Sequence, residues 1–154
     1  MEYVWFSLGF FVIHLISYVA AGVLNQQLLS KDLYGGEDAL YAPFFRNMDD
    51  LAERRRQGRV MVPAQLIRAV LMSVVLYPIL GALGDLSFGM RFAFLSGLMF
   101  VYADLAAATP FSNNVEGIVY LKPRFTTWGV FWRIQSEAIV YSVLFGVTAA
   151  WWLF

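Results

Sequence analysis

Four long apolar segments dominate this chain of 154 residues, at about 4–24, 60–83, 88–108 and 128–154. A helix needs about 20 mostly apolar residues to cross a bilayer core, so each segment is long enough. The whole chain is 60% hydrophobic and only 14% charged. Soluble domains carry about 25% charged residues. The sequence therefore predicts an all-α, polytopic integral membrane protein, with one membrane domain over 1–154 built as a four-transmembrane-helix bundle.

Two prolines lie in the second segment. Pro63 stands near its expected start, where a missing N–H costs little, whereas Pro78 lies deep inside and predicts a kink. The first segment is preceded only by Glu2 and is longer than the core of a secretory signal, so we expect a retained helix.

Basic residues outside the spans set the expected orientation. The connections 25–59 and 109–127 hold Lys31, Arg46, Arg54, Arg55, Arg56, Arg59, Lys122 and Arg124. The positive-inside rule then places both connections in the cytoplasm and both termini outside, with the cell membrane as the expected location.

The first connection predicts a turn at Gly35-Gly36 and an interfacial aromatic stretch at 41–45. A short helix is expected from Asp49 or Asp50 to Gln57, ended by Gly58. Its exposed arginines are candidates for binding anionic lipid head groups: Arg54, Arg55, Arg56 and Arg59. Alternatively, they are a topology signal on a solvated helix. The segment is nearly neutral as a whole, which argues against a nucleic-acid partner.

The second connection predicts another short interfacial helix. Asn113 and Glu116 have the spacing of a capping box, which places the helix start at this point. Two arrangements remain open, a surface loop or a re-entrant loop that carries Glu116 and Tyr120 to the level of the charges within the spans.

Arg68, Asp104 and Glu137 each interrupt an apolar run. A charge inside a bilayer costs at least a few kcal/mol, so such residues usually face a bundle interior and mark a working site. With Arg133 they predict one layer of two arginines and two acids. Arg133, Glu137 and Tyr141 are four residues apart and share a helix face.

Three interpretations of this layer stay open. The arginines can extend to the interface, or the charges can form structural ion pairs such as Asp104 with Arg68, or they can line a ligand cavity open to the cytoplasm. The candidate ligand-binding residues are Arg68, Asp104, Arg133, Glu137, Tyr141, His14 and Glu116. For His14, a neutral histidine hydrogen-bonded across helices is favoured over a metal ligand.

Catalytic and cofactor signatures are absent from the sequence. It has no cysteine, no Gly-rich phosphate loop and no metal-ligand spacing, so we expect neither a cofactor nor a bound metal. The leading hypothesis is binding or transport of an ion, a proton or a small polar or amphipathic ligand. The alternatives are a non-catalytic subunit or scaffold of a membrane complex, and an intramembrane enzyme acting on a lipid. A homo-oligomer is expected through a small-residue face, at Ser142, Gly146 and Ala150.

Overall fold

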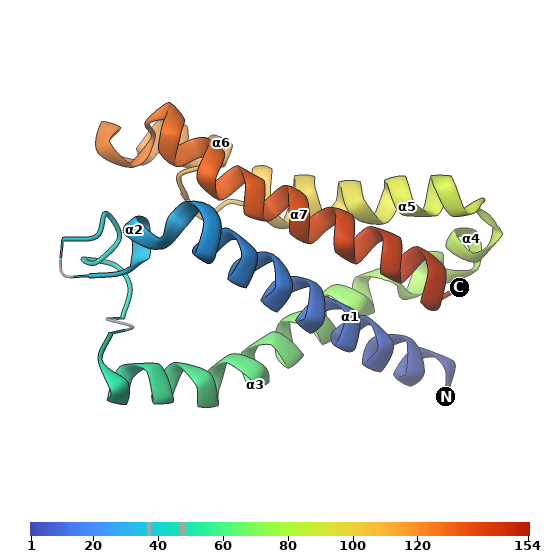
Figure 1. The fold of residues 1–154 in the computed structure, drawn as a ribbon. Coiled ribbons are helices and arrows are strands. Elements are labelled where there is room, and N and C mark those ends of the chain that lie inside the picture. Colours follow the sequence, from blue (N-terminus) through green and yellow to red (C-terminus); the bar gives the residue numbers. More distant parts are fainter. Residues whose placement is uncertain (37, 47–48) are drawn as a thin grey trace.

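The computed structural model describes residues 1–36, 38–46 and 49–154, and within these ranges the regular structure is entirely helical. Four helical stretches are long and apolar enough to cross a membrane. They run over Glu2–Tyr34, Leu51–Asp85, Phe88–Leu105 and Trp128–Trp152 (Figure 1). The four predicted spans are therefore present, with shifted ends.

The first span extends ten residues beyond its expected end. Helix α1 (Glu2–Asn25) continues through a π-helical turn, Gln26–Ser30, into the short helix α2 (Lys31–Tyr34). The chain then turns at Gly36, whose φ of 90° is a conformation that favours glycine. The Gly36 N–H donates to a carboxylate oxygen of Asp49 at 3.0 Å, which holds this turn.

The second span begins at Leu51 rather than near residue 60. Asp50 caps α3 (Leu51–Leu76) by accepting a hydrogen bond from the Ala52 N–H at 2.7 Å. The expected helix end at Gly58 was wrong, and Pro63 lies inside α3 rather than in its first turn. A single glycine costs a helix only about 1 kcal/mol, which is too little to end one that continues on both sides.

Pro78 does interrupt the second span. At this point α3 gives way to a 3-10 turn, Tyr77–Ile79, which leads into α4 (Leu80–Asp85). The predicted kink is therefore confirmed, and its cause is the hydrogen bond that proline cannot donate.

The third span changes helix type partway along. Ser87 caps α5 (Phe88–Gly97), which passes into a π-helical segment, Leu98–Leu105. The helix thus ends three residues before the expected boundary at 108. Long π-helical segments are rare and often lie at functional sites.

The last span is a single uninterrupted helix. Before it, the second connection contains α6 (Val115–Tyr120) and a 3-10 turn, Pro123–Phe125. Helix α7 (Trp128–Trp152) then begins after Thr127, whose side chain accepts from the Val130 N–H at 3.4 Å.

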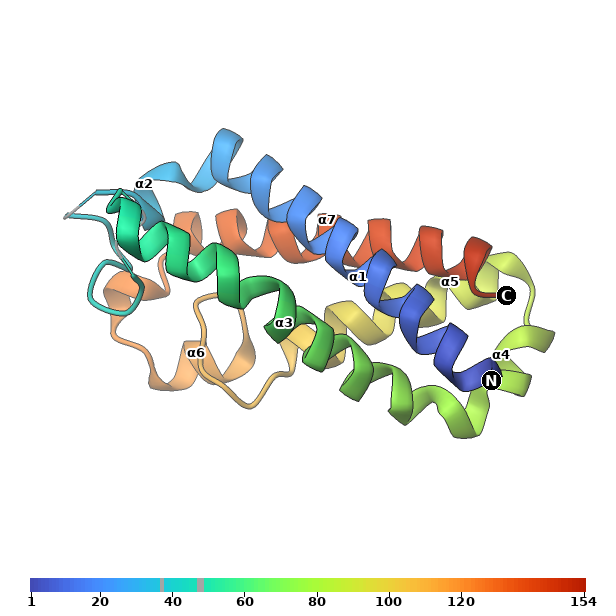
Figure 2. The same cartoon turned by 90° about the horizontal axis from the view of Figure 1, so that it is seen from below.

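Helices α1 and α7 lie side by side at the centre of the bundle. Helix α3 packs on α1, and α5 packs on α7, whereas no comparable packing joins α3 to the third span. Both termini and α4 lie at one end, the terminal end (Figures 1 and 2). The longer connections lie at the other, the loop end, where α3 diverges from the remaining helices (Figure 1).

The main hydrophobic core lies between the helices and includes Phe10, Phe145, Leu95 and Met99, all of them at most 1% exposed. A second, smaller core at the loop end surrounds Tyr41 and Phe125. The polar residues of the spans therefore lie between the main core, toward the terminal end, and the smaller core among the connections at the loop end.

The small-residue face of α7 packs within the chain. Ser142, Gly146 and Ala150 are buried, and a Cβ at Gly146 would lie 1.9 Å from the Ser96 Oγ. The expectation that this face joins two copies is therefore corrected, because α5 already occupies it.

Candidate functional site

Three of the four charges predicted within the spans face one region, and we call Arg68, Asp104 and Glu137 the three-charge site. Arg68 lies midway along the second span, Asp104 in the π-helical segment and Glu137 on α7. Arg68 lies within electrostatic range of Asp104, and Asp104 of Glu137. Their side chains nevertheless form no ion pair with one another. The expected pairing of Arg68 with Asp104 is therefore not formed.

Glu137 is held by an amide of the first span. Its Oε2 accepts from Asn25 Nδ2 at 2.9 Å, and the same amide group donates to Ser30 Oγ at 3.0 Å. Ser136 Oγ donates to Asn25 Oδ1 at 3.2 Å. Asn25 is only 5% exposed, so its amide is fixed and fixes the carboxylate in turn. The acid cannot turn freely toward Arg68.

Asp104 is held in the same way by the second connection. Its Oδ2 accepts from Asn113 Nδ2 at 2.8 Å, and Asn113 is fully buried. The cap of α6 is Asn114 rather than the expected Asn113, because Asn114 Oδ1 accepts from the Gly117 N–H at 2.8 Å. Asn114 thus shapes the loop, and Asn113 is left to orient the carboxylate.

A buried hydrogen-bonded hub lies beside the site and joins all four spans. His14 Nδ1 lies 2.6 Å from the Tyr141 hydroxyl, and His14 Nε2 lies 2.9 Å from Gln65 Oε1. The Gln65 oxygen can only accept, so Nε2 carries a proton. The Tyr141 hydroxyl also donates to Met99 Sδ, on the third span, at 3.5 Å. His14 is therefore hydrogen-bonded across helices, and its neutral state stays a prediction.

Arg133 does not belong to the site. Its guanidinium forms two hydrogen bonds with Asp32 of α2, at 2.9 and 2.7 Å. The predicted layer of four charges therefore loses one member. Both bonds come from one guanidinium nitrogen, Nη1, which donates to the two carboxylate oxygens of Asp32.

Helix α6 lies at the surface of the described fold. Its apolar side chains are more than half exposed: Val115, Ile118, Val119 and Tyr120. Glu116 is half-buried on this helix. Exposed apolar side chains suit contact with lipid in either arrangement, so the choice between a surface loop and a re-entrant loop stays a prediction.

The arginines suggested for lipid head groups lie on α3 at the loop end. The exposed side chains are those of Arg54, Arg55, Arg56 and Arg59. Glu53 forms an ion pair with Arg46 and so does not neutralise them directly.

An aromatic cluster connects the two long connections, and sequence reasoning missed it. Tyr41 is 3% exposed, stacks against Phe111 and Phe125, and is hydrogen-bonded to Ser112. Burial raises the pKa of the Tyr41 hydroxyl and outweighs the opposite effect of that hydrogen bond. Ser112 adjoins Asn113, so this cluster supports the loop that orients Asp104.

Two further partners escaped the sequence analysis, Gln65 and Asn113. Gln65 is a polar residue one turn before Arg68 in an apolar run, and this position was a usable signal. Asn113 gave no such signal, because its role depends on how the second connection folds back onto the third span.

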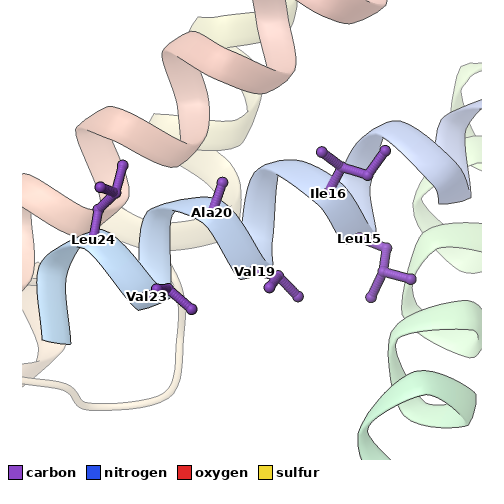
Figure 3. Close-up of a pocket in the computed structure, with 6 residues that line it drawn as sticks. All are labelled: Leu15, Ile16, Val19, Ala20, Val23 and Leu24. Carbon is purple, nitrogen blue, oxygen red and sulfur yellow. The ribbon is translucent and has the colours of Figure 1, made fainter. Parts of the chain in front are cut away.

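Two hollows of the surface lie away from the three-charge site. One is lined by Leu15, Ile16, Val19, Ala20, Val23 and Leu24, and Figure 3 shows these apolar side chains spread along α1. The other lies at the terminal end, between Trp5, Gly81 and Phe154. Neither contains a residue of the site. In the part of the chain that the structure describes, no three His, Cys, Asp or Glu side chains are grouped to hold a metal ion.

Comparison with known proteins gives no relative for this chain: no family model, no curated protein and no solved structure matches it.

Proposed function

We propose that this membrane protein binds a small polar or amphipathic ligand at the three-charge site, with Arg68 holding an anionic group of that ligand. The observation that supports the proposal is the state of Arg68. It lies within a span, its side chain is exposed, and it forms no ion pair with any described residue, although Asp104 is near.

An unpaired arginine in a span is costly, and pairing with Asp104 would reduce the cost. Among the described residues this pair is not formed, and each acid is instead hydrogen-bonded through one oxygen to a buried amide, Asn113 for Asp104 and Asn25 for Glu137. Opposite charges held apart in this way are preorganised for a molecule that enters between them.

The position of the site favours binding from the loop end. Asp104 and Glu137 lie nearer that end, where α3 diverges from the other helices (Figure 1). Tyr141 lies one turn beyond Glu137 toward the terminal end, where its hydrogen bond with His14 and the aromatic core close the bundle. This closure supports binding of a ligand rather than its passage across the membrane.

The test measures thermal unfolding of the purified protein in an uncharged maltoside detergent. The added probe is a mixture of phosphatidylglycerol and phosphatidylethanolamine, which both carry an anionic phosphodiester. We expect the mixture to raise the midpoint of unfolding of the wild type by several degrees. For Arg68→Gln we expect about a tenfold loss of apparent affinity or more, because a hydrogen bond to a charged group contributes about 1.5–3 kcal/mol.

Arg133→Gln is the matched control, because it removes the same charge from a span at a place that Asp32 already neutralises. It is expected to keep the response to lipid. Equal responses of Arg68→Gln and the wild type would contradict the proposal. If Arg68→Gln instead failed to assemble with partner proteins while lipid binding stayed intact, the scaffold alternative would replace it.

A further inference from the structure

We infer that the ligand is a zwitterion, with its anionic group on Arg68 and a primary ammonium group between Asp104 and Glu137. This inference rests on the proposed function and names the class of ligand. The evidence is the unequal use of the two oxygens in each carboxylate of the site.

Each acid of the site uses one oxygen and leaves the other free. Asp104 accepts from Asn113 through Oδ2, and Glu137 accepts from Asn25 through Oε2. No described residue donates a hydrogen bond to Asp104 Oδ1 or Glu137 Oε1, and neither oxygen is fully enclosed. Gly22 leaves room beside Glu137, since even a Cβ there would stay 3.6 Å from Oε1. Both free oxygens can therefore receive donors from outside.

The charges of the site also favour a cation on the ligand. Arg68 is one basic group in a region with two carboxyl groups, those of Asp104 and Glu137. A purely anionic ligand brings no donor to the carboxyl oxygens and adds negative charge beside them. A zwitterion satisfies Arg68 and also brings donors to those oxygens.

The kind of cation follows from the acceptors. A primary ammonium has three N–H donors, which suit two carboxylate oxygens that only accept. A quaternary ammonium such as choline has no N–H and prefers aromatic faces. The site therefore predicts a preference for ethanolamine-type over choline-type ligands. Tyr18 lies within electrostatic range of Arg68 and Glu137, and its hydroxyl can contact the same ligand.

Two sources can supply this chemistry, a phospholipid head group or a soluble phosphoamine. The experiment titrates the wild-type protein in maltoside detergent with phosphatidylethanolamine, phosphatidylglycerol and phosphatidylcholine in separate series. Parallel series use phosphoethanolamine and phosphocholine. Thermal unfolding gives an apparent affinity for each probe. A response to the lipid series alone identifies a lipid ligand, and a response to phosphoethanolamine identifies a soluble one.

We expect the ethanolamine probe to bind about tenfold more tightly than its choline counterpart, and more tightly than phosphatidylglycerol. In Asp104→Asn and Glu137→Gln this preference should shrink toward equality while the response to phosphatidylglycerol remains. Asp85→Asn is the control, because Asp85 is an exposed acid at the terminal end, far along the fold from the site.

Equal binding of the ethanolamine, choline and glycerol probes by the wild type would overturn the inference and leave the proposed anion site standing. A preference for ethanolamine that survives in both acid variants would also overturn it. Failure of the proposed function would give another result, in which Arg68→Gln binds every probe as tightly as the wild type does. The ranking in the wild type needs no variant, so a variant that does not fold cannot block the test.

Discussion

Replacing Gly146 by valine is expected to separate α5 from α7 and to lower the midpoint of thermal unfolding by about 2–12 °C. Even the first carbon of a side chain at this position would lie 1.9 Å from Ser96 Oγ and 2.9 Å from the Ser96 backbone nitrogen. The hydroxyl can rotate away, but the backbone of α5 must move. Overpacking of this kind costs about 1–3 kcal/mol, and a few degrees are lost per kcal/mol.

The measurement is thermal unfolding in detergent, followed by circular dichroism. Gly97→Val is the matched control, because a Cβ at Gly97 meets no atom within 4 Å and the change in helix propensity is the same. We expect the control to lose less than a third of what Gly146→Val loses. Similar losses in the two variants would show that α5 and α7 do not pack as closely as described.

Removing the His14 hub is expected to destabilise the protein at least as much as the change at Gly146. His14→Phe keeps a ring of similar shape but leaves the Tyr141 hydroxyl and the Gln65 oxygen without their partner in the bundle interior. Hydrogen bonds between membrane helices contribute about 0.6–2 kcal/mol each, and a buried group left unpaired adds about 1–3 kcal/mol. We therefore expect a loss of about 2–4 kcal/mol in the free energy of unfolding.

A double-mutant cycle isolates the bond itself. Tyr141→Phe should destabilise the wild type but have little further effect in His14→Phe, because the shared bond is already lost. Tyr102→Phe supplies the control, since it deletes the same hydroxyl from a side chain that is 75% exposed. Additive losses for His14 and Tyr141 would mean that they do not interact.

The sequence predicted the spans because hydropathy is a local property. Four apolar segments of sufficient length predict four helices, whichever helices they later pack against. Pro78 breaks its helix through the loss of a local hydrogen bond. The residue at which a helix ends depends on smaller differences in free energy. Gly58 carried the expected stop, yet α3 continues through it, because one unfavourable residue cannot end a helix that is favourable on both sides.

The site was predicted in part. Arg68, Asp104 and Glu137 were identified because a charge in an apolar run is conspicuous on its own. Their partners were not, because each one comes from a distant part of the chain. Arg133 was assigned to the site on helical spacing alone. Its preference for Asp32, 101 residues away, could be seen only once the first span proved long enough to bring Asp32 beside α7.

The central position of α1 and α7 has a consequence for the order in which the protein assembles in a membrane. Helices α1 and α7 are neighbours in the fold, so α1 cannot pack on α7 until all the residues between them have been synthesised. During that wait His14 can reach Gln65 on α3, but its second partner, Tyr141, has yet to be made. The inner face of α1 stays open to lipid until α7 arrives. A chain that ends before residue 128 would therefore leave His14 in the bilayer without its Tyr141 partner.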